Sequence, residues 1–169
     1  MEGYVQNHKL LTFSLCFIVI ICFIGCTRTK RVLESTTTRW AEIYQITLDS
    51  YLEQDTALTE NIDFIAIDLT TLEFANDDDK KVITLWFEER YVPVKDINLD
   101  GLREKGLFDG MYISDGVFLK IISVTENDDE IIIEGMKYRG ARAANWFETK
   151  WQLNSGSWEF MGTAMTMIS

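Results

Sequence analysis

Two aspartates of this 169-residue chain follow short apolar segments and could support acid–base or cation chemistry. Asp68 closes segment 62–68, and Asp96 follows segment 91–95. If these segments form neighbouring parallel strands, both carboxylates lie at carboxyl ends of strands, where open α/β sheets bind their ligands. Two carboxylates that lie close together can bind Mg²⁺ or share a proton. One hypothesis is therefore a carboxylate- or metal-dependent hydrolase that uses Asp68 and Asp96.

Neither aspartate lies in a complete motif. Asp68 and its surroundings resemble the phosphate loop of the actin and sugar-kinase superfamily, but Thr70 stands in place of a glycine and its side chain would crowd a phosphate. Segment 96–101 matches the first half of a calcium loop, but Leu107 replaces the bidentate glutamate. We therefore expect a turn after Asp68, a short helix capped by Asn98, and no metal or cofactor.

A second candidate site is the only basic cluster in an acidic domain, formed by Lys137, Arg139 and Arg142. The two arginines flank a Gly-Ala pair between two expected strands. Arginines with small neighbours can hold a carboxylate or phosphate through paired hydrogen bonds. The alternative is that they pair with acidic side chains of the same domain. Arg139 and Arg142 are therefore candidate ligand-binding residues.

The elements that position these residues can be predicted from the spacing of apolar side chains. Apolar residues recur three and four apart over 38–54, which predicts an amphipathic helix. The apolar segments 62–68 and 91–95 flank a helical pattern over 76–90 that begins with Asn and three Asp, the spacing of a βαβ unit. Pro93 places the second strand at a sheet edge.

The rest of the chain has the pattern of a β-meander. The expected strands are separated by turn-forming residues and span 117–125, 130–138, 145–153 and 157–168. The sequence therefore predicts an α+β fold, with an N-terminal amphipathic helix packed on a four-stranded antiparallel meander and a βαβ-like segment between them. A sheet curled around a helix is similar to cystatin-like and NTF2-like cones, a resemblance that implies a shape and no activity.

Composition excludes several classes of function. All three cysteines lie at or before Cys26, and the single histidine is His8. The later residues therefore cannot form a disulfide framework, a Cys/His zinc site or a Ser-His-Asp triad. From Val32 onward the chain has 26 acidic and 12 basic side chains, a net charge of −14. Such a domain repels nucleic acid, so no nucleic-acid partner is expected.

The N-terminus has the layout of an export signal, with Lys9 before an apolar run that ends in Ile24-Gly25-Cys26. A small residue followed by cysteine at this point resembles the lipobox of bacterial lipoproteins. The resemblance implies that Cys26 is lipidated, that 1–25 is a removed signal peptide, and that the protein is held on the extracytoplasmic face of the cell membrane. Residues 26–38 would be a tether and 39–169 a single globular domain.

The alternative is a retained transmembrane helix. The 16 residues from Leu10 to Gly25 are slightly fewer than the roughly 20 that span a bilayer. Three basic residues follow immediately, at Arg28, Lys30 and Arg31, and basic residues favour the cytoplasmic side. In this case the chain would be a single-pass membrane protein with a cytoplasm-facing regulatory domain.

Most of the domain resembles a group of small, uncharacterised lipoproteins and secreted proteins of low-GC Gram-positive bacteria. The matching pieces lie on the expected elements: Ile43-Tyr44 to Leu52, Ile65 to Asp68, Asp79-Lys80-Lys81, Leu102 to Leu107, and Gly156-Ser157-Trp158 to Ser169. The resemblance implies a shared fold and no particular reaction. The sequence therefore favours a non-enzymatic accessory domain that binds a protein or small ligand, and we expect the concave face of the meander to be the binding surface.

Overall fold

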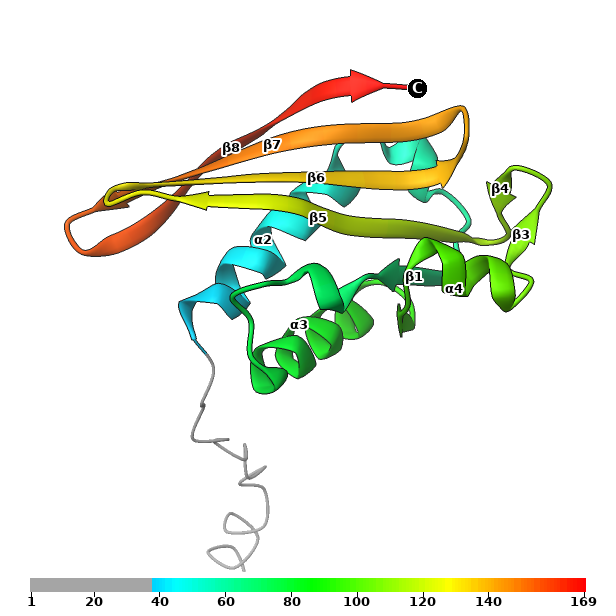
Figure 1. The fold of residues 1–169 in the computed structure, drawn as a ribbon, viewed down its shortest axis with the longest axis horizontal. Coiled ribbons are helices and arrows are strands. Elements are labelled where there is room, and N and C mark those ends of the chain that lie inside the picture. The colour runs from blue at the N-terminus through cyan, green and yellow to red at the C-terminus, as the bar shows by residue number, and fades with distance from the viewer. Residues whose placement is uncertain (1–37) are drawn as a thin grey trace, which may run out of the picture. The chain divides into compact units, whose positions relative to one another are not determined.

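A computed structural model describes residues 38–169, which form a curled eight-stranded sheet packed with helices (Figure 1). The predicted α+β class is confirmed. The predictions for residues 1–37, which include the anchor and lipidation of Cys26, lie outside the described residues.

Helix α2 (Arg39–Glu53) begins at a capping threonine. The Thr38 hydroxyl accepts a hydrogen bond from the N–H of Trp40 at 3.1 Å, and the helix ends where Gln54 becomes extended. Its apolar stripe is buried from Trp40 to Leu52. Thr38 therefore belongs to the folded domain rather than to the tether.

A parallel βαβ unit follows, as predicted. It comprises β1 (Phe64–Ile67), α3 (Asp77–Arg90) and β2 (Val94–Asp96), and β1 and β2 pair in parallel. A reciprocal capping box between Asn76 and Asp79 starts α3. Strand β2 pairs only with β1, so it is the edge strand that the preceding proline indicates.

The chain then forms α4 (Leu99–Glu104) and a small hairpin of β3 (Phe108–Asp109) and β4 (Tyr112–Ile113). The side chain of Asn98 accepts a hydrogen bond from the N–H of Gly101 at 2.8 Å, which confirms the predicted cap. The sequence pattern does not indicate the hairpin, because two-residue strands have no recognisable period.

The meander contains four long antiparallel strands. They are β5 (Gly116–Glu126), β6 (Glu130–Gly140), β7 (Ala143–Asn154) and β8 (Ser157–Ile168). Ser155 and Gly156 have φ values of 51° and 87°, as a two-residue type I′ turn requires, and join β7 to β8.

One sheet unites the two parts of the fold, since β1 pairs in parallel with β5 as well as with β2. The strand order is β2-β1-β5-β6-β7-β8, and the β3–β4 hairpin joins β6 where Tyr112 pairs with Gly140. The β1–β5 pair is not visible in the sequence, because the two strands are distant along the chain and each is apolar by itself.

Helix α2 packs against the inner face of the meander (Figure 1). The ring of Tyr51 stacks on Phe147 with centroids 4.6 Å apart, and the indole N–H of Trp151 donates to the Thr47 hydroxyl at 3.1 Å. Helix α2 therefore occupies part of the concave face, and ligand binding on that face stays a prediction.

Candidate functional site

Asp68 and Asp96 lie at the carboxyl ends of adjacent parallel strands, as their positions in the sequence predict. Asp96 Oδ1 accepts a hydrogen bond from the N–H of Leu69 at 3.2 Å. Asp68 is 7% exposed, and its Oδ1 accepts from the Thr70 hydroxyl at 2.5 Å. Both carboxylates thus hold the turn of η2 (Leu69–Thr71), which is a structural task.

The surroundings of this pair do not complete a metal centre. Among residues 38–169, no three His, Cys, Asp or Glu side chains lie close enough to share an ion. A hollow of about 520 Å³ beside Asp96 is lined by two lysines, Lys80 and Lys81, as well as by Asp77. Positive and negative side chains balance there, so the hollow does not favour a cation. The hydrolase hypothesis keeps only the juxtaposition of the two aspartates as support.

The candidate residues Arg139 and Arg142 have different surroundings. Arg139 lies within β6, and its guanidinium donates to the carbonyls of Glu60 at 2.9 Å and Leu58 at 3.5 Å. Arg142 lies exposed in the turn between β6 and β7. Main-chain carbonyls, rather than the acidic side chains expected as the alternative, thus engage Arg139. Anion binding by the two arginines stays a prediction.

Lys137, the third member of the basic cluster, is fully buried. Its ammonium donates to the carbonyls of Gln54 and Asp55, just beyond the end of α2. The Asp55 carboxylate accepts from the Asn145 amide at 2.9 Å. Burial lowers the pKa of Lys137 to about 8, and the negative charge of Asp55 opposes this change. The ammonium of Lys137, on strand β6, therefore binds the carbonyls at the C-terminal end of α2, where the helix dipole is negative, and links the helix to the sheet.

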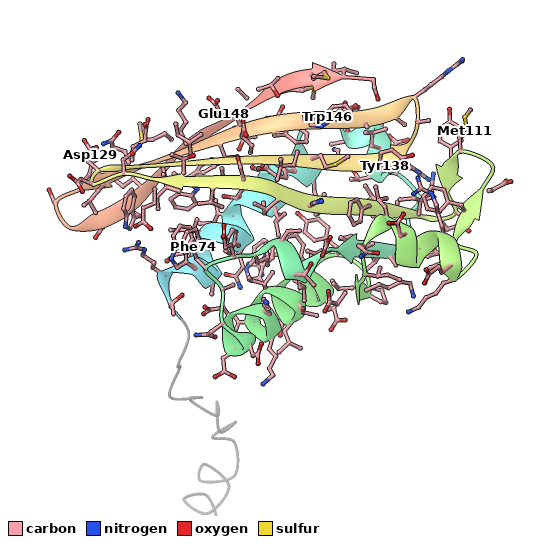
Figure 2. The ribbon with its side chains drawn as sticks, in the orientation of Figure 1. Phe74, Met111, Asp129, Tyr138, Trp146 and Glu148 are labelled. Carbon is pink, nitrogen blue, oxygen red and sulfur yellow. The ribbon has the colours of Figure 1, made fainter. Side chains whose placement is uncertain are left out.

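A groove of about 1120 Å³ lies at the N-terminal end of α2, and we call it the aromatic groove. Four segments build it: the start of α2, the loop before α3, the β5–β6 turn and the β7–β8 hairpin. The side chains that matter for its chemistry are Arg39, Glu42, Phe74, Glu126, Asp128 and Trp158. Figure 2 shows Phe74 and Asp129, which follows Asp128, towards the same end of the domain.

Stacked rings and one guanidinium give the aromatic groove its character. Trp40 stacks on Phe74 with centroids 4.6 Å apart, and Phe74 remains 41% exposed. The guanidinium carbon of Arg39 lies 5.4 Å from the ring centroid of Trp40 and 5.5 Å from that of Trp158, and Arg39 also pairs with Glu126. The groove thus combines exposed aromatic surface with charged side chains.

Sequence reasoning misses this groove because its walls come from separate parts of the chain. The aromatic pattern of β7 and β8 predicts strand core, which is correct for Phe147 and Trp151. Trp158 is only partly buried and lines the groove. The one signal in the sequence that Trp158 lies outside the core is its position soon after the β7–β8 turn, at one end of a strand.

No family model, curated protein or solved structure matches the chain. Within residues 38–169, none of the helices has both the length and the apolar character needed to cross a membrane.

Proposed function

We propose that this protein is a membrane-anchored extracytoplasmic lipoprotein whose folded domain binds a ligand or protein and catalyses no reaction. The apolar run that ends in Ile24-Gly25-Cys26 supports export and lipidation of Cys26. The resemblance of the chain to small Gram-positive lipoproteins supports the same anchor. The lack of His and Cys after Cys26 removes the thiol nucleophile and the most frequent general base, histidine, which supports binding rather than catalysis.

The aromatic groove is the observation that carries the binding proposal. It offers the exposed ring of Phe74 and the partly buried ring of Trp158 within a hollow of about 1120 Å³. Concave surfaces with aromatic walls and a few charged groups are the usual binding sites of proteins, because burial of the rings supplies affinity and the charges supply orientation. The proposed binding surface is thus one end of the sheet rather than its concave face.

The finer features of the fold belong to the same proposal. A helix enclosed by a curled sheet is the architecture of cystatin-like and NTF2-like cones, and we propose that this likeness holds for the architecture alone. A shared architecture of this kind hosts many unrelated activities, so the function rests on the groove and on the anchor.

The anchor can be tested by fatty-acid labelling in bacterial cells, with wild type beside Cys26→Ser. We expect the wild type to incorporate label and external protease to degrade its domain in intact cells, whereas Cys26→Ser should lose the label. A matched Cys22→Ser variant should keep it, because Cys22 does not follow a small residue at the end of the run. Equal labelling of wild type and Cys26→Ser would contradict lipidation of Cys26.

The same experiment decides the topological alternative. An unlabelled wild-type protein whose domain resists external protease would be a retained helix with a cytoplasm-facing regulatory domain. This alternative is supported by the three basic residues that follow the apolar run.

A further inference from the structure

We infer that the aromatic groove is selective for an organic cation, and that its occupant is a basic peptide segment that presents an arginine or lysine beside apolar side chains. This inference rests on the proposed function, which makes the groove the binding site, and it adds the chemistry of the ligand.

The lining of the groove carries an excess of negative charge. Three acidic side chains line it, Glu42, Glu126 and Asp128, against the single base Arg39. Arg39 pairs with Glu126, whereas Glu42 and Asp128 form no ion pair with any other residue that the structure describes. The surrounding domain adds to this field, because residues 38–169 contain 25 acidic and 12 basic side chains. A cationic partner is therefore attracted and correctly oriented.

The groove already holds a guanidinium, that of Arg39. Arg39 lies within 6 Å of the ring centroids of both Trp40 and Trp158, the range in which a cation is attracted to the negative face of a ring. Its side chain is 47% exposed, so it can be displaced. An incoming arginine could take over the face of Trp158 and the carboxylate of Glu126 with the same chemistry.

At about 1120 Å³ the groove is larger than most small-molecule pockets, which occupy roughly 300–1,000 Å³. A single ammonium or guanidinium would leave the exposed ring of Phe74 uncovered. A peptide segment with apolar side chains beside its cation covers both kinds of surface.

The domain contains a second arginine–tryptophan pair that serves as a matched control. The Arg90 guanidinium carbon lies 3.9 Å from the ring centroid of Trp86 on α3, and neither residue lines the groove. Arg90→Ala therefore removes the same charge and the same kind of contact as Arg39→Ala, but at a different place.

The test measures fluorescence anisotropy of a labelled nine-residue peptide of alternating arginine and leucine, titrated with the full chain in a nonionic detergent. A second peptide contains citrulline in place of arginine, which keeps the shape of the side chain and removes its charge. We expect the arginine peptide to bind at least about tenfold more tightly than the citrulline peptide, because charged hydrogen bonds and the cation–π contact are lost together.

Three variants should differ in their effect on the affinity for the arginine peptide. Arg39→Ala should tighten binding of the arginine peptide about three- to tenfold, because it removes a competing cation, whereas Arg90→Ala should leave it unchanged. Trp158→Leu should weaken binding between about two- and thirtyfold, the range of cation–π energies. Unchanged urea midpoints of the variants would show that the fold is intact.

The failures are distinguishable. If both peptides bind equally and Trp158→Leu weakens both, the groove remains a binding site and its cation selectivity is wrong. If Arg39→Ala and Trp158→Leu change neither affinity, or if neither peptide binds, the inference is overturned together with the groove as a peptide site. Complete displacement of the arginine peptide by choline at about 10 mM would show that the groove recognises the cation alone, and it would overturn the assignment of a peptide with apolar side chains as its occupant.

Discussion

Replacing Lys137 with methionine tests whether a buried charge fastens α2 to the sheet. Lys137 is fully buried, and its ammonium is the donor to two main-chain carbonyls beyond the end of α2. Methionine fills a similar volume but donates nothing, so the Gln54 carbonyl loses the ammonium donor, while the Asp55 carbonyl keeps the N–H of Leu58. Because losing a hydrogen bond from a charged donor to a partly buried carbonyl costs free energy, we expect Lys137→Met to lower the free energy of unfolding by roughly 1–3 kcal/mol at pH 7.

The pH dependence gives a sharper test of the same contact. Burial lowers the pKa of Lys137 from 10.5 to about 8. Below pH 8 the lysine is charged in both the folded and the unfolded chain, whereas between pH 8 and 10.5 only the unfolded chain keeps the proton. The unfolded state then binds more protons, so the free energy of unfolding rises with pH in this window.

The size of this rise follows from the two pKa values. The full change from 10.5 to about 8 corresponds to at most about 3.4 kcal/mol, of which about 2 kcal/mol is reached by pH 9.5. The effective dielectric around buried charges in proteins is higher than that of a dry interior, so we expect about half of this, or roughly 1 kcal/mol, between pH 7 and 9.5.

The assay is urea denaturation of the full chain, followed by tryptophan fluorescence from pH 7 to 9.5, for wild type and Lys137→Met. Lys150→Met, on the exposed side of β7, is the matched control and should behave as wild type. Burial raises the pKa of Tyr44 to about 12, so tyrosines lower stability as pH rises above about 10, and the range stops before that point. If the difference between wild type and Lys137→Met is flat or shrinks with pH, the reasoning is refuted.

Three further predictions concern other contacts. Asp79→Asn should lower the free energy of unfolding by about 2–3 kcal/mol, because the fully buried carboxylate accepts hydrogen bonds from the N–H and the hydroxyl of Thr38. Asp77 is exposed, so Asp77→Asn should change the free energy of unfolding by less than about 0.5 kcal/mol in the same urea titration. Gly135→Ala should lower the thermal midpoint, because its Cβ would lie 2.5 Å from a buried tyrosine ring. Mg²⁺, Mn²⁺ and Ca²⁺ should not raise that midpoint; a rise that Asp96→Asn abolishes would revive the hydrolase hypothesis.

Much of the fold can be predicted from the sequence, because local patterns report which side of each element is buried. The stripe over 38–54 predicts α2, and the run of acidic residues after Asn76 predicts the start of α3. The β5–β8 meander is equally visible, since its turns carry their own signals. The β3–β4 hairpin and the parallel β1–β5 pair are not visible, because short strands have no period and distant pairing has no local signal.

The candidate site, too, could be predicted only in part from the sequence. The sequence alone determines which chemical groups the domain possesses: carboxylates in excess, no Cys or His after Cys26, and the pair Asp68 and Asp96 at two strand ends. Only the tertiary structure shows which of these groups already form hydrogen bonds within the domain. Hydrogen bonds within the domain engage Asp68, Lys137 and Arg139, because folding must satisfy every polar group that it removes from water. The aromatic groove exists only where four distant segments meet, so its chemistry belongs to the fold and to no single stretch of the chain.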